Sequence, residues 1–117
     1  MAKKEKKDDD VFSMIEKRYF QLDREFDKLL SACKSEDEKK ELKRDYIIAR
    51  SNYKKSMNLT FDQNDPIIKE LTGELSSIEK RIEKDIKVLQ NAGSVLKMIS
   101  ESVKIASSII VTVSSFV

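Results

Sequence analysis

The sequence lacks histidine and tryptophan, and its 117 residues include only two glycines, one proline and one cysteine. Tight turns depend on glycine and proline, so their scarcity argues against barrels, sandwiches and doubly wound sheets, which need many such turns. Without histidine, the commonest general base, the usual catalytic triad and the Glu-x-x-His ligand pairs of di-iron bundles are missing. The composition therefore favours an all-α protein and argues against an enzyme.

A dominant charge of one sign is also missing, because 23 basic residues stand against 21 acidic ones, for a net charge of +2. Interleaved charges of both signs give no strong field that would steer nucleic acid. The basic stretch from Lys39 to Lys55 is expected to solvate an outer helix face, with Tyr46 and Tyr53 on the apolar side. The sequence thus argues against a nucleic-acid partner, and no motif indicates a cofactor, a metal ion or a small-molecule substrate.

Five of the first seven residues are charged, and no apolar stretch follows them, unlike in a secretory signal. We expect residues 1–7 to form a flexible tail and residues 8–117 to form a single helical domain. We also expect a cytoplasmic protein, unless a specialised system exports it. Cys33 has no second cysteine to pair with and falls in the apolar register of its segment, which predicts a small core residue.

Apolar residues recur at steps of three and four along most of the chain, which is typical of amphipathic helices. The pattern predicts an antiparallel bundle of three to four long helices at about 8–34, 36–58, 66–90 and 94–117. Ser35 with Glu38 forms a capping-box signal at the second start, and Asp65-Pro66 is a strong signal at the third. The second helix is expected to bury one side made of Leu42, Tyr46, Ala49, Tyr53 and Met57, broadened by Ile47 and Ile48.

The last two predicted helices keep one apolar register across residues 91–94, so they can also be one long kinked helix. Gly93 followed by Ser94 fits a helix stop and a new start, but glycine inside a helix costs only about 1 kcal/mol. A continuous helix from Pro66 to Val117 would be about 78 Å long, and much of it would be left uncovered. We expect a kink or a short break at about 91–94.

The segment after Gly93 has the most informative composition, because its apolar surface covers more than half of a helix circumference. Such a helix cannot be covered by one partner helix, so it must lie inside a bundle, between subunits or on a membrane. The run from Ile109 to Val113 is β-branched, which is typical of strands, so a helix there must be imposed by packing. The residues expected to form the contact seam are Leu96, Ile99, Val103, Ala106, Ile110 and Val113.

These observations predict a non-enzymatic helical interaction module that binds a second copy of itself, or another helical protein, through this seam. The alternative is a membrane-active protein that uses the same segment. The 13 uncharged residues after Lys104 reach about 20 Å as a helix, against a hydrocarbon core of about 30 Å, so the contact would be peripheral or conditional. A third reading is a plain bundle in which this helix is only core.

The acidic residues do not indicate a catalytic site or a metal site. Glu79 and Glu83 lie one turn apart among basic residues, and we expect both on a solvated helix face. The segment from Asp62 to Asp65 resembles the start of a calcium-binding loop, but it lacks the glycine and the later glutamate that such a loop needs.

Overall fold

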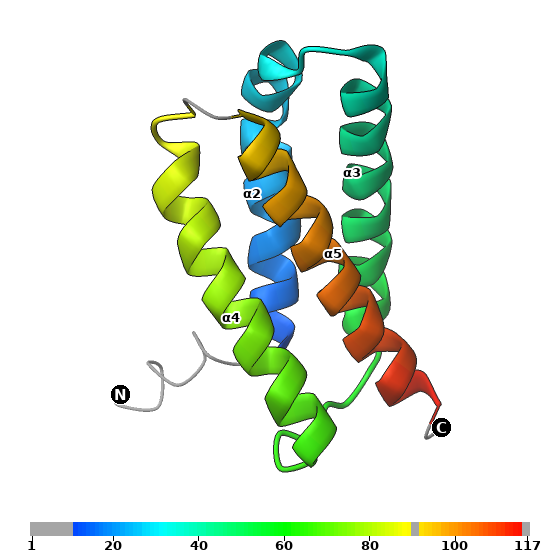
Figure 1. Ribbon diagram of the computed structural model, residues 1–117. Coiled ribbons are helices and arrows are strands. Elements are labelled where there is room, and N and C mark those ends of the chain that lie inside the picture. The colour runs from blue at the N-terminus through cyan, green and yellow to red at the C-terminus, as the bar shows by residue number, and fades with distance from the viewer. Residues whose placement is uncertain (1–10, 90–91, 116–117) are drawn as a thin grey trace.

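A computed structural model describes residues 11–89 and 92–115, and these residues form four helices (Figure 1). They are α2 (Val11–Ala32), α3 (Glu36–Ser56), α4 (Pro66–Ile86) and α5 (Ala92–Ser114). The predicted all-α bundle is confirmed. The predicted tail at residues 1–7, the start of the first helix at residue 8 and the end of the last at residue 117 lie outside the described residues.

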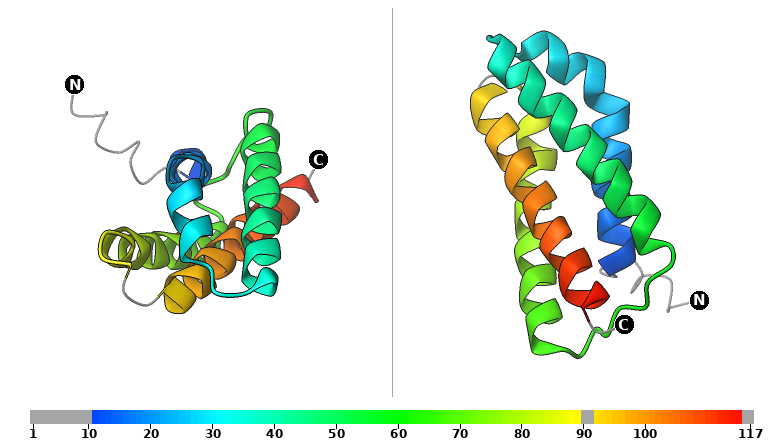
Figure 2. Two further views of the ribbon diagram at one scale, coloured as in Figure 1. Left: turned by 90° about the horizontal axis from the view of Figure 1, so that it is seen from above. Right: turned by 90° about the vertical axis from the view of Figure 1, so that its right-hand side faces the viewer.

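The helices pair as two antiparallel hairpins, α2 with α3 and α4 with α5, whose connections both lie at the upper end in Figure 1. We call them the first and the second hairpin. The loop at residues 57–65 joins them at the lower end and crosses the bundle, so that α3 and α4 lie on opposite sides (Figure 2). As a result α3 and α5 are neighbours that run parallel, whereas α2 and α5, which also contact each other across the two hairpins, run antiparallel.

The chain breaks between α4 and α5, so the alternative of one long kinked helix is wrong. The helix α4 ends at Ile86 and α5 begins at Ala92, so the break comes slightly before the predicted position, and Gly93 stands in the first turn of α5. Leu89 adopts a φ of 53°, in the left-handed region that bulky residues rarely occupy. The Leu89 side chain packs against the core, so a partly buried leucine takes the left-handed conformation after α4, and Gly93, the expected helix stop, lies within α5.

Both predicted helix caps are present. Ser35 Oγ accepts a hydrogen bond from the Glu38 amide at 3.1 Å, although the Glu38 carboxylate accepts from the amide of Lys34, one residue before the capping-box position. At the start of α4, Asp65 Oδ1 accepts from the amides of Ile67 and Ile68 at 2.8 and 3.2 Å.

We expect Asp65→Ala to lower the free energy of unfolding by about 1 kcal/mol, because two amide donors of the first turn lose their acceptor. Asp65→Asn keeps a side-chain oxygen and should cost less. Urea denaturation followed by circular dichroism measures both variants. Equal losses for alanine and asparagine would contradict the capping role.

The helix α5 is the centre of the bundle, since it contacts each of the other three helices. Twelve of its 23 residues are buried, which confirms that the apolar C-terminal segment must be covered. The β-branched Ile109, Ile110 and Val113 are helical and buried, so packing does override their strand propensity there.

The buried apolar side chains form two clusters along the bundle axis. The upper core cluster consists of Leu22, Leu29, Leu42, Ala49, Ile82, Ile86, Val95, Leu96, Met98, Ile99 and Val103. The lower core cluster consists of Val11, Met14, Ile15, Ile68, Leu75, Ile105, Ala106, Ile109, Ile110 and Val113. The two clusters meet at the level of Arg18 on α2, Glu79 on α4 and Ser102 on α5, which are all polar.

The first hairpin is held together by aromatic rings. Tyr19 of α2 stacks on Tyr53 of α3, with ring centroids 5.5 Å apart, and lies 5.7 Å from the ring of Tyr46. Phe26 extends this contact at 5.2 Å from Tyr46, and Phe20 meets Tyr53 edge-on at the same distance. These rings form an aromatic ladder along the seam between α2 and α3.

The predicted buried side of α3 is only partly right. Leu42 and Ala49 are buried, but Ile47 and Met57 are 65% and 54% exposed. The reason is that α3 contacts two helices, α2 and α5, through different kinds of side chain. It presents its tyrosines to α2 and turns buried Asp45 and Asn52 toward α5.

Candidate functional site

The six residues predicted to form a contact seam all lie on α5, and the structure brings them together on its inner side. None is more than 8% exposed. Leu96, Ile99 and Val103 belong to the upper core cluster, and Ala106, Ile110 and Val113 to the lower one. In a single folded chain, this seam is therefore covered by the chain's own helices.

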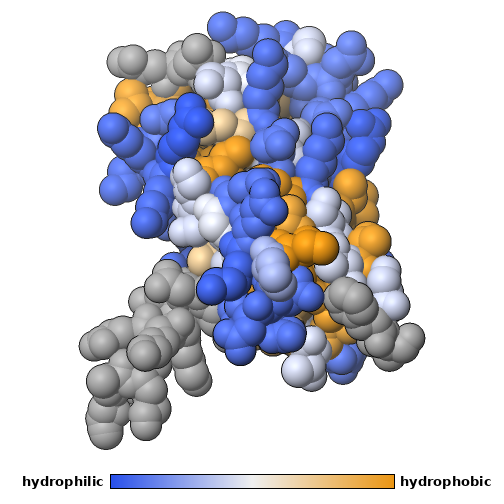
Figure 3. Space-filling view, turned by 60° about the horizontal axis from the view of Figure 1, so that its bottom comes forward, coloured by the Kyte–Doolittle hydropathy of each residue, from blue (hydrophilic) through white to orange (hydrophobic). Residues whose placement is uncertain are grey.

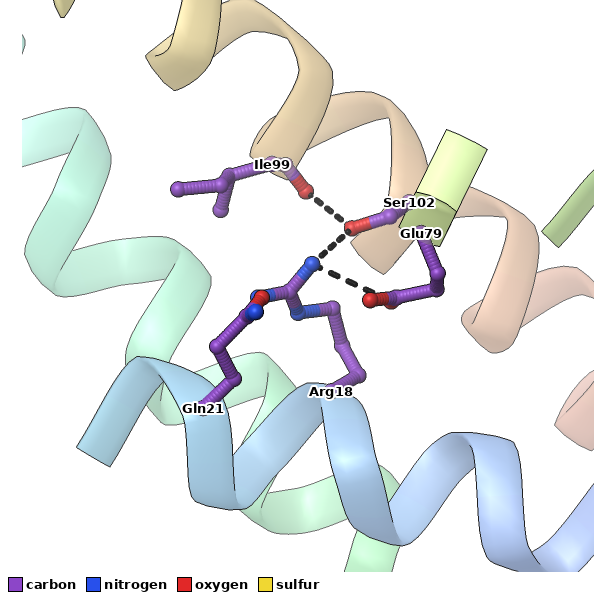
Figure 4. A network of polar contacts seen from close by, with 5 residues as sticks. All are labelled: Arg18, Gln21, Glu79, Ile99 and Ser102. Carbon is purple, nitrogen blue, oxygen red and sulfur yellow. Dashed lines mark hydrogen bonds and ion pairs between the residues drawn. The ribbon is translucent and has the colours of Figure 1, made fainter. Parts of the chain in front are cut away.

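A buried polar cluster crosses the core where the two apolar clusters meet (Figure 4). Arg18 of α2 is 1% exposed, and its Nη1 donates to Glu79 Oε2 of α4 at 3.1 Å and to Ser102 Oγ of α5 at 3.2 Å. Its Nη2 donates to Gln21 Oε1. The Ser102 hydroxyl in turn donates to the carbonyl of Ile99 at 2.7 Å. We call Arg18, Gln21, Glu79 and Ser102 the central polar layer, which joins three helices.

The expectation that Glu79 lies on a solvated face is wrong, whereas Glu83 is exposed as expected. The Glu79 side chain is only 14% exposed, because buried Arg18 requires an opposite charge beside it. The positions of Arg18 and Glu79 in the sequence already indicated that both are buried, and sequence reasoning missed this signal. Arg18 stands between Ile15 and Leu22, and Glu79 between Leu75 and Ile82, at the steps of three and four that define a buried face. The central polar layer is thus a polar interruption in two apolar seams.

Burial works against both charges of the central polar layer. Burial lowers the pKa of the Arg18 guanidinium, and the Glu79 charge opposes this. Burial likewise raises the pKa of the Glu79 carboxyl against the attraction of Arg18. Among the described residues, Arg18 Nε has no hydrogen-bond partner. A buried ion pair is in general weak evidence for stability, so the benefit of the layer is better sought in specificity.

Two further polar contacts join the hairpins along α3 and α5. Ser100 Oγ donates to Asp45 Oδ2 at 2.5 Å, and Asn52 Nδ2 donates to Ser107 Oγ at 3.1 Å. Asp45 and Asn52 are each 5% exposed. On both helices the two positions are seven residues apart, and polar groups at heptad spacing between parallel helices fix their register. We call these contacts the inter-hairpin polar pairs.

Asp45 should make stability depend on pH. Burial raises the pKa of its carboxyl, although the hydrogen bond from Ser100 opposes the rise. A carboxyl with a raised pKa binds its proton more readily in the folded than in the unfolded chain. Its contribution is therefore most favourable below about pH 4, the ordinary aspartate range, and is lost as the pH rises through the folded pKa.

Asp45→Asn removes this charge and keeps an oxygen that can accept from Ser100. We expect the variant to lose less stability than the wild type when the pH is raised from about 4, the ordinary aspartate pKa, to neutral pH in urea titrations. Asp27→Asn, on the exposed side of α2, is the matched control and should follow the wild type. A profile for Asp45→Asn that overlays the wild type would contradict the argument.

The other sequence signals take structural roles. Asp62 Oδ1 accepts from the Asn64 amide at 3.0 Å, and Asp65 caps α4. Within residues 11–89 and 92–115, no group of three or more His, Cys, Asp or Glu side chains is arranged to hold a metal ion.

Cys33 is partly buried against the upper core cluster, and its Sγ donates to the carbonyl of Leu29 at 3.4 Å. No helix in the part of the chain that the structure describes has the length and apolar character needed to cross a membrane.

On the face shown in Figure 3, hydrophilic side chains predominate and hydrophobic patches lie between them. Exposed apolar side chains occur in α2, α3, α4 and α5, at Met57 in the loop after α3 and at Val88 after the end of α4. They are Phe20, Ile47, Met57, Ile67, Val88 and Val111. Val111 is 64% exposed and stands on the outer side of α5, beside buried Ile110. The inner and outer sides of α5 are thus sharply different.

Comparisons with models of known protein families, with curated proteins and with solved structures find no match. Function is therefore argued from the geometry of this chain.

Proposed function

We propose that this chain is a non-enzymatic helical interaction protein that associates with copies of itself through α5. One observation carries the proposal. The inner side of α5 is apolar over its whole length and also bears serines that pair with specific polar residues on other helices. Apolar contact area supplies affinity, and the polar positions supply the choice of partner and register.

The buried polar groups support an interaction role because their hydrogen bonds join different helices. Arg18 links α2 to α4 and α5, and Asp45 and Asn52 link α3 to α5. Each contact costs desolvation, and such costs are best attested where polar groups select a partner or a register.

Light scattering measures the mass of the full chain over a range of concentrations and tests the proposal. We expect a wild-type mass that rises toward a multiple of the single-chain mass of 13.5 kDa. Neighbouring residues provide a matched pair of variants. Val111→Asp places a charge on the exposed side of α5 and should keep the wild-type mass. Ile110→Asp places one on the buried side and should abolish the higher mass.

Circular dichroism on the same samples shows whether Ile110→Asp also loses its helices. A wild type that stays at the single-chain mass at every concentration would overturn self-association. If in that case Ile110→Asp unfolds, the apolar side of α5 serves only as the core of one chain.

A further inference from the structure

The buried hydrogen bonds described above that join different helices lie between the two hairpins. The aromatic ladder fills the first hairpin, and Tyr46 Oη donates to Asp23 Oδ1 across it at 2.7 Å. Both core clusters contain residues of the first and of the second hairpin, so apolar contacts join the helices within the hairpins and across them. The central polar layer and both inter-hairpin polar pairs lie between the hairpins. The hairpins therefore meet across an apolar interface that carries polar contacts at set positions.

One loop, at residues 57–65, is the link between the hairpins. Most of its residues are exposed, and the hydrogen bonds that the Asp62 and Asp65 carboxylates accept come from amides of the loop and of the first turn of α4. Leu59 and Phe61 pack against the lower core cluster. Nine residues reach about 30 Å when extended, so the loop can cross to a neighbouring molecule as well as across its own bundle.

A second copy cannot reach the inner side of α5 while the bundle is closed, because the seam is buried. We propose that two copies exchange their second hairpins, so that α5 of each chain packs on the first hairpin of the other. This inference rests on the proposed self-association and specifies its geometry. The interface in the pair is then the same as the interface within one chain, with the loop at residues 57–65 as the hinge.

The buried polar groups identify the occupant of this interface as a second copy. A helix of another sequence would leave Arg18 without Glu79 and Ser102, and it would leave Asp45 and Asn52 without their serines. Buried polar groups without partners disfavour such a complex. The second hairpin of an identical chain restores every contact, because it carries the same residues at the same spacing.

Cross-linking between singly substituted full-length chains tests the exchange. All variants carry Cys33→Ser. One chain carries Asn52→Cys and the other Ser107→Cys, which join α3 to α5 in the folded protein. The two chains are unfolded and refolded together, treated with a short bismaleimide and separated by mass. We expect a product of twice the single-chain mass that contains one of each variant and links residues 52 and 107.

A second pair of chains replaces residues that are less buried than Asn52. Glu41 Oε2 of α3 lies 3.4 Å from Ser100 Oγ of α5, in a more exposed part of the interface between these two helices. Chains with Glu41→Cys and chains with Ser100→Cys should therefore also be linked to each other. The control pair, Asp23→Cys and Tyr46→Cys, spans the first hairpin, which does not separate in an exchange. Mixed chains of the control pair should give no link. Circular dichroism confirms that each variant is helical.

The outcomes separate the two proposals. Dimers without links between chains at 52–107 and 41–100 overturn the exchange and leave self-association intact. Links of equal yield in the control pair show random collision and also overturn it. A wild type that remains a single chain overturns the proposed function, and the exchange with it.

Discussion

Replacing Glu79 with alanine should lower the free energy of unfolding by about 3–5 kcal/mol, because the variant leaves the Arg18 charge buried without its partner. Arg18 keeps its hydrogen bonds to Ser102 and Gln21, but neither neutral group balances the charge. A loss of this size is a large part of the total stability of a domain of this length. Urea denaturation at neutral pH, fitted with a common slope, measures it.

Two controls isolate the charge pair. Glu83→Ala removes a carboxylate one turn away on the exposed side of α4 and should change stability by less than about 0.5 kcal/mol. Arg18→Met combined with Glu79→Leu replaces both charges with apolar groups and should recover most of the loss, or exceed the wild type. Equal effects of Glu79→Ala and Glu83→Ala would show that Glu79 is solvated in solution.

Replacing Ile99 with alanine should lower the free energy of unfolding by about 2–5 kcal/mol. The side chain is fully buried in the upper core cluster, so the substitution removes apolar contacts and leaves a cavity. Val111→Ala on the same helix is the matched control, because its side chain is 64% exposed, and it should change stability by less than about 0.5 kcal/mol. A loss for Ile99→Ala as small as that of the control would contradict the central place of α5.

Ile99→Ala also tests whether exchanged pairs are held together by the same contacts as the single chain. If exchanged pairs re-form the contacts of the single chain, the substitution weakens both states equally. The variant should then unfold at lower urea concentration while its proportion of dimer at a given protein concentration stays close to that of the wild type. If the dimer instead formed through a separate contact that involves Ile99, the variant would lose the dimer. Light scattering at urea concentrations below the unfolding transition distinguishes these two modes of association.

Helix positions were predictable to within a few residues because the signals for them are local. Ser35 and Asp65 cap helices through bonds to amides two or three residues away, and the apolar steps mark buried faces without knowledge of any partner. The seam on α5 was predictable for the same reason. Local signals failed at Leu89, whose left-handed conformation depends on a side chain packed against residues distant in sequence.

The sequence by itself determined that the chain is all-α, where most of its helices begin and end, and that the side of α5 from Leu96 to Val113 must be covered. Only the tertiary structure decided what covers it and which polar residues enter the core. The 57–65 loop crosses the bundle and places α3 beside α5, so Asp45 and Asn52 meet Ser100 and Ser107. Burial of an isolated charge or amide is unfavourable, and a partner on another helix removes most of that cost. Such pairings depend on which helices are neighbours, and that is a property of the chain path and not of any single segment.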